Sequence, residues 1–166
     1  MKRIFSTLII LLSFPCLVHA ADTIVWSVND EGQNWIELKA VITADGSGNV
    51  ASPTETSTVP AAIWDVAKVL SRVIAVPDAG DTAPTDEYDL LLYKSSTISV
   101  DMLGGLANGT WCDGTNATMD FPVTATNGGP IYVTDLPVAS GSGFGADNAC
   151  TFYLLLVDVN SVKVSR

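Results

Sequence analysis

The side chains of this chain that could do chemistry are carboxylates and hydroxyls, with almost no imidazole or thiol. The one histidine, His19, lies in an N-terminal segment that has the pattern of a secretory signal. A chain without histidine after that segment cannot run a Ser-His-Asp or Cys-His mechanism, and it offers no imidazole to zinc or copper. The chemistry left open is a carboxylate pair, a Ser-Lys arrangement or calcium coordination.

Carboxylates are concentrated between residues 78 and 89. The calcium candidates among them are Asp78, Asp81, Asp86 and Asp89. Their density suits a calcium ion held together with loop carbonyls, but their spacing is not that of a regular calcium loop. We therefore predict no metal or cofactor, with calcium as the alternative.

A glycosidase built on Asp86 and Asp89 would need a sugar cleft with aromatic walls. The four tryptophans are scattered along the sequence, and we assign Trp26, Trp35 and the other two to the core. We predict that the chain is not an enzyme.

Two cysteines, Cys112 and Cys150, follow the signal segment. An even number of cysteines in an exported chain favours a disulfide. The closed loop of about 38 residues would contribute roughly 4 kcal/mol on the chain-entropy estimate. We predict that the two are bonded; the alternative is a pair of unrelated buried thiols.

Residues 1–20 match a secretory signal peptide. Lys2 and Arg3 precede an apolar run from Ile4 to Phe14, and the segment ends in Val-His-Ala. The run is shorter than the roughly 20 residues of a membrane span. We predict cleavage after Ala20, export to the periplasm or the exterior, and no membrane association after cleavage. The alternatives are an N-terminal anchor and a buried first strand.

The charge of the chain is strongly acidic. The full sequence has a net charge of −10, and removal of the signal with its two cations leaves six cations against 18 acids, a net charge of −12. Such a chain is not expected to bind nucleic acid phosphates or an anionic membrane surface. Residues 21–166 are enough for one ordinary domain.

The mature sequence consists of short β-branched and aromatic segments separated by Gly, Pro, Asn and Asp. In residues 35–44 the apolar side chains alternate with polar ones, which is the period of a strand. Residues 61–76 begin with helical spacing and end as a strand. The predicted strands are 23–28, 35–44, 66–76, 88–94, 97–103, 121–125, 130–138, 150–159 and 161–165. We predict an all-β fold, a β-sandwich or jelly-roll-like single domain.

The stretch VIAVPDAGDTAPTDEYDLLLYKSSTISVDMLGGLAN, residues 73–108, combines a Pro-Asp-Ala-Gly turn, an acidic block that opens a strand, and a Val-Asp-Met-Leu-Gly-Gly segment. The residues that carry the pattern are Pro77, Asp78, Gly80, Thr82, Ala83, Pro84, Thr85, Asp86, Tyr88, Asp89, Val100, Asp101, Leu103, Gly104, Gly105, Leu106 and Asn108. This pattern resembles small structural proteins of tailed bacteriophages. The resemblance implies a non-enzymatic virion component that decorates a capsid, tail or filament.

The predicted strand 88–94 is apolar on both faces. Leu90 and Leu92 share one face, and Leu91 and Tyr93 share the other. Such a strand is either central or in contact with a partner, so Leu91 and Tyr93 are interface candidates. The run 152–157 has the same two-sided character, and we expect a homo-oligomer or a larger virion or filament assembly. The alternative is an exported binding module that engages carbohydrate or protein through loops 104–120 and 139–149.

Overall fold

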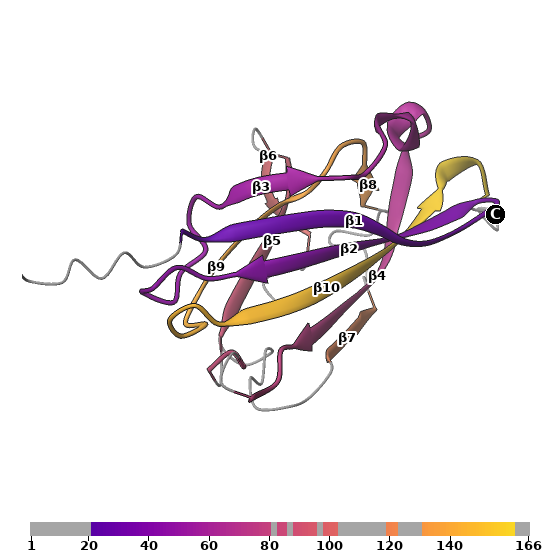
Figure 1. The fold of residues 1–166 in the computed structure, drawn as a ribbon. Coiled ribbons are helices and arrows are strands. Elements are labelled where there is room, and N and C mark those ends of the chain that lie inside the picture. The colour runs from indigo at the N-terminus through magenta and orange to yellow at the C-terminus, as the bar shows by residue number, and fades with distance from the viewer. Residues whose placement is uncertain are drawn as a thin grey trace, which may run out of the picture.

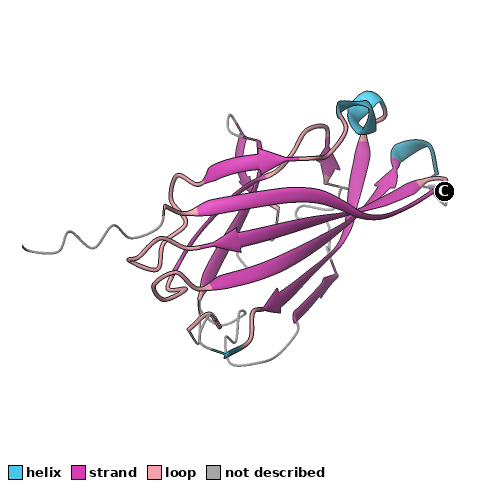
Figure 2. Cartoon of the chain, viewed as in Figure 1, coloured by secondary structure: helices cyan, strands magenta, loops and turns pink. Residues whose placement is uncertain are grey.

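The computed structural model describes residues 21–80, 83–85, 88–95, 98–102, 119–122 and 131–161. The predicted signal segment lies outside these residues. The described part is all-β, which confirms the predicted fold class. Figure 2 shows strands over most of the drawn chain, with only short helical turns between them. No helix in the described ranges has the length and apolarity to cross a membrane.

The large sheet contains seven strands. In spatial order six of them are β3 (Thr54–Ser57), β1 (Thr23–Gly32), β2 (Trp35–Thr43), β10 (Ala149–Asp158), β4 (Lys68–Pro77) and β7 (Met119–Pro122), and β8 (Tyr132–Val133) also pairs with β4. Neighbouring strands are antiparallel except β1 and β3, which are parallel. The long strands β1, β2, β10 and β4 form the middle of this sheet (Figure 1).

The small sheet has three strands in the order β6 (Ile98–Asp101), β5 (Asp89–Ser95) and β9 (Val138–Ser142). In Figure 1 it lies behind the large sheet. A bridge between Val50 and Gly141 links β9 to the segment that follows β2. The two sheets therefore enclose one core between them.

The core follows the alternation of each strand. On β2 the side chains of Ile36, Leu38 and Ala40 are buried, as the period-two pattern predicts. The small sheet contributes Leu90, Leu92 and Ala139, among others, to the same buried cluster. Because strand side chains alternate between faces, one face of the large sheet packs this core and the other face points outward.

Several boundaries differ from the predicted ones. β1 continues through residues 29–32, beyond the predicted strand 23–28, and an irregularity in register between Val28 and Asp30 accommodates the extra residue. β3 lies between the predicted strands 35–44 and 66–76, where no strand was predicted. All four of its side chains are exposed, so no apolar alternation marks it. Residues 30–32 pair with β2 and β3 pairs with β1. This backbone pairing makes both segments strands, although their amino-acid composition does not favour strands.

The later boundaries show the same effect. β9 occupies 138–142, where a loop at 139–149 was predicted, and the predicted strand 161–165 begins instead with Ser161 in the 3-10 helix η4 (Val159–Ser161). The predicted strand 66–76 is present as β4, which begins at Lys68, and the early part of 61–76, where the spacing left a helix open, contains the 3-10 helix η1 (Ala61–Asp65).

Two turns interlock at one end of the sheets. Asp45 Oδ1 accepts hydrogen bonds from the backbone N–H groups of Ser47 and Asn49 at 2.8 and 2.9 Å. The N–H of Phe144, in the second turn, donates to the carbonyl of Gly48 at 3.0 Å. Gly48 has a φ of +78°, and a Cβ there would lie 2.7 Å from the backbone nitrogen of Gly145. Both the conformation and the space therefore require glycine at position 48.

Gly48→Ala is expected to lower the free energy of unfolding by about 2–4 kcal/mol, because the left-handed conformation disfavours a Cβ and the facing backbone must move. Gly80→Ala is the matched control, since Gly80 has a φ of +75° and nothing within 4 Å of its Cβ position. It should lose only the conformational part, about 1–2 kcal/mol. Urea denaturation of both variants measures the difference, and equal losses would show that the close approach is not real.

Candidate functional site

Apolar side chains lie on the outer face of the large sheet, the face turned away from the small sheet. The apolar residues of this outer face are Val25 on β1, Trp35 and Val41 on β2, Tyr153, Leu155 and Val157 on β10, and Val69, Ile74 and Val76 on β4. Val25 and Trp35 are 45% and 38% exposed, and the others are half-buried. Exposed apolar area that spans several strands is the kind of surface that meets another protein.

Four charged residues share this outer face. Strand register places Asp30 opposite Glu37 on β1 and β2, and Glu37 shares its row with Leu155 and Arg72 on the next two strands. The neighbouring row contains Lys39. Asn29 Nδ2 donates a hydrogen bond to Glu37 Oε1 at 2.6 Å. The outer face of these four strands thus carries two acids and two cations.

A hollow of about 450 Å³ lies within the outer face, lined by Asn34, Trp35, Glu37, Leu155 and Val157. Its tryptophan packs on the neighbouring strand: a Cβ at Gly32 would lie only 2.1 Å from Trp35 Nε1. The assignment of Trp35 to the core was therefore wrong, whereas Trp26 is fully buried as predicted. The indole of Trp35 covers its cross-strand glycine and remains partly open to solvent.

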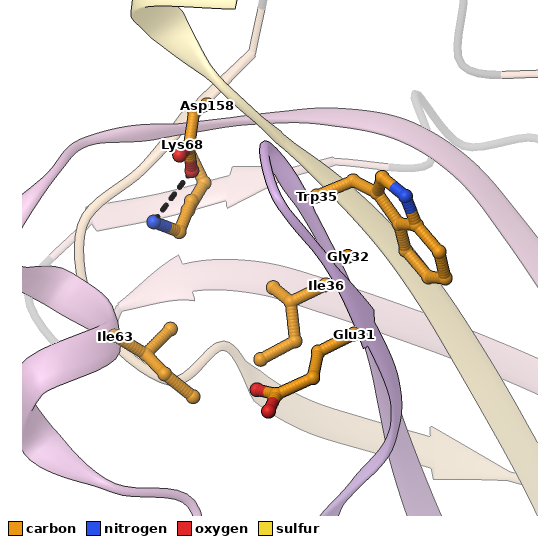
Figure 3. Close-up of a pocket in the computed structure, with 7 residues that line it drawn as sticks. All are labelled: Glu31, Gly32, Trp35, Ile36, Ile63, Lys68 and Asp158. Carbon is orange, nitrogen blue, oxygen red and sulfur yellow. Dashed lines mark ion pairs between the residues drawn. The ribbon is translucent and has the colours of Figure 1, made fainter.

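A second, polar pocket lies beside the β1–β2 hairpin, and Figure 3 shows the residues that line it, Gly32 and Trp35 of the hairpin among them. It measures about 120 Å³, and its lining includes Glu31, Ile36 and Ile63. Lys68 Nζ and Asp158 Oδ1 form an ion pair in its wall at 2.7 Å, with their side chains 9% and 24% exposed. Register makes these two residues direct cross-strand partners on β4 and β10. The pair joins the end of β10 to the start of β4, and no residue pattern in the sequence predicts it.

A third hollow, of about 460 Å³, lies between the segment before β3 and the edge strand β9. Its lining residues are Ile24, Ala51, Ser52, Pro53, Glu55, Tyr93, Val138, Ala139 and Ser140. The interface candidate Tyr93 is thus part of a groove, and both Leu91 and Tyr93 are half-buried while Leu90 and Leu92 are buried. β5 therefore has apolar side chains on both faces, as predicted. An interface role for Leu91 and Tyr93 stays a prediction.

The calcium candidates are only partly described. Asp81 and Asp86 lie outside the described residues. Asp78 Oδ1 accepts a hydrogen bond from the N–H of Ala79 at 2.9 Å, and Asp89 Oδ2 accepts one from Ser142 Oγ at 3.3 Å. In the part of the chain that the structure covers, no three His, Cys, Asp or Glu side chains come together as a metal site. Calcium binding therefore stays an untested alternative.

Cys150 is buried on β10. Its Sγ lies 3.1 Å from Tyr88 Oη and 3.3 Å from the carbonyl oxygen of Val76, and the ring of Tyr88 packs against Phe144 with centroids 4.7 Å apart. Cys112 lies outside the described residues, so the predicted disulfide is not tested. The loop 104–120 proposed for binding also falls almost wholly outside the described ranges.

Comparison of this chain with protein-family models, with curated protein sequences and with solved structures gave no match.

Proposed function

We propose that this chain is a non-enzymatic structural protein that acts through its surfaces, as a virion-like component that decorates a capsid, tail or filament. The observation that carries the proposal is the outer face of the large sheet. Its strands already pack a core on their inner face, yet they keep apolar side chains such as Val25, Trp35 and Leu155 on the other. Apolar surface of this kind is buried when it meets another protein.

The resemblance of residues 73–108 to structural proteins of tailed bacteriophages supports the same proposal. The described residues of this stretch form the end of β4, the small-sheet strands β5 and β6, and the turns beside them. These residues form turns and strands, and Val73, Leu90 and Leu92 among them are part of the core. A stretch that determines the fold in this way is consistent with a structural protein that functions by assembling with other proteins.

An exported binding module is the second candidate. The groove between the β3 side and β9 favours it, because an aromatic residue, Tyr93, lines this groove together with the polar residues Ser52, Ser140 and Glu55. Aromatic and polar groups in one concave site are typical of small-ligand recognition. A Tyr93→Ala variant that loses binding to immobilised glycans or a protein ligand would favour this candidate.

The proposed function predicts that the mature protein self-associates or is recovered with a larger particle. Its net charge of −12 opposes contact between copies, so association should strengthen as salt screens the repulsion. Sedimentation of the mature chain at low and moderate salt measures this, and mass spectrometry of the native particles tests for its presence there. A monomer at both salt concentrations that is also absent from the particles would contradict the proposal.

A further inference from the structure

We propose that the outer face of the large sheet packs on the same face of a second copy of this chain, about a two-fold axis that runs along the strands between β2 and β10. The inference rests on the proposed function and names its partner surface. Two antiparallel sheets that pack face to face keep their strands within about 30° of each other, so the rows of the two copies stay approximately aligned near the axis.

Charge selects a second copy as the occupant. The chain has a net charge of −10, so most contacts between copies bring acids together. On the outer face of β1, β2, β10 and β4, the strands nearest the axis, Asp30 and Glu37 are balanced by Lys39 and Arg72. Two copies that meet at this face avoid the repulsion that most of the surface would impose, and each supplies both signs of charge to the other.

Strand register then defines which residues meet. One row crosses the sheet as Asp30 on β1, Glu37 on β2, Leu155 on β10 and Arg72 on β4. A two-fold axis that runs along the strands between β2 and β10 places β1 of one copy over β4 of the other. It leaves the position along the strands unchanged, so each row faces the same row of the second copy. Asp30 of each copy therefore lies over Arg72 of the other, and symmetry makes this ion pair twice. Both side chains are exposed.

The neighbouring rows are complementary under the same axis. Lys39 and Tyr153 are cross-strand partners on β2 and β10, so the axis sets the ammonium of one copy over the ring of the other, a cation–π arrangement. Trp35 and Val157 are partners in the same way. The hollow of about 450 Å³ spans β2 and β10 beside these residues, and the partly exposed indole of the second copy is the group that fills it.

A charge exchange tests the axis. Asp30→Arg and Arg72→Asp should each weaken self-association at least about tenfold, because each sets like charges opposite one another in two places. The double variant Asp30→Arg/Arg72→Asp restores the pairs in reverse and should associate within about threefold of the unchanged protein. Sedimentation equilibrium at one salt concentration measures all four proteins, and thermal unfolding shows that each is folded. A double variant as weak as the single ones would overturn the axis.

A pair of apolar substitutions tests the face. Leu155→Glu on the outer face should abolish association. Leu91→Glu tests the rival interface that the sequence predicts on β5 of the small sheet, and on the present inference it should leave association unchanged. The reverse result would overturn this inference and leave the proposed function standing, with the small sheet as its contact. A protein that is monomeric in solution but present in native particles would also overturn the inference alone. Absence from both would remove the proposed function with it.

Discussion

Asp158→Ala is expected to lower the free energy of unfolding by about 3 kcal/mol, because removal of one partner of a buried ion pair leaves the other charge without compensation. The charge left behind is that of Lys68, whose side chain is only 9% exposed and whose ammonium lies 2.7 Å from Asp158 Oδ1. Ile36 and Ile63 line the same pocket as Lys68. Urea denaturation followed by circular dichroism measures the loss.

The double variant Lys68→Met/Asp158→Ala is the control for this prediction. It removes both charges and replaces the lysine stem by an apolar side chain of similar length, a change that is often neutral or stabilising for buried pairs. It should therefore be more stable than Asp158→Ala alone by about 1–3 kcal/mol. If both variants lose the same stability, the packing around β4 and β10 is what Asp158 supports, and the ion pair contributes nothing.

The ion pair also shows where sequence reasoning ends. The alternation on β2 predicts which of its side chains are buried, because a half-buried strand repeats every two residues. Lys68 and Asp158 are paired only because β4 and β10 are neighbours with an irregularity in register between Leu155 and Leu156. One extra residue in a strand changes which side chains face each other. No residue type in the sequence shows that β4 and β10 are neighbours or that their register is irregular.

The outer face is a different case, because part of it was visible in the sequence. The run 152–157 is apolar on both faces, and this alone predicted surplus apolar surface. Trp35 was assigned to the core because tryptophan is a large apolar residue, although it alternates in phase with Glu37 and Lys39. The phase of the alternation is the better guide, since it places Trp35 with polar residues on the outward side. The charge pairing across the face needs strand order, which the sequence does not contain.

Trp26→Ala is expected to lower the free energy of unfolding by about 3–5 kcal/mol, the range for deletion of a large aromatic side chain from a core. Trp26 is fully buried. Its indole Nε1 also donates a hydrogen bond to Glu55 Oε1 at 2.7 Å, which ties the edge strand β3 to β1. The variant therefore loses buried apolar contacts and the side-chain link to β3 together. A chain of this size has a total stability of roughly 5–15 kcal/mol, so the loss should be visible as a large fall in the denaturation midpoint.

Trp35→Ala is the matched substitution, of the same residue type on the adjacent strand but on the outward side. Because Trp35 is 38% exposed and its indole lies over the cross-strand Gly32, its loss should lower the free energy of unfolding by about 1 kcal/mol, much less than the loss of Trp26. Its effect should fall on self-association instead, which we expect to weaken at least about tenfold as the hollow between β2 and β10 loses the group that fills it. Denaturation and sedimentation on the same two variants separate the roles of the two tryptophans. If Trp35→Ala destabilises the chain as strongly as Trp26→Ala, the indole belongs to the core of the monomer, and the large sheet has no free outer face for a second copy to cover.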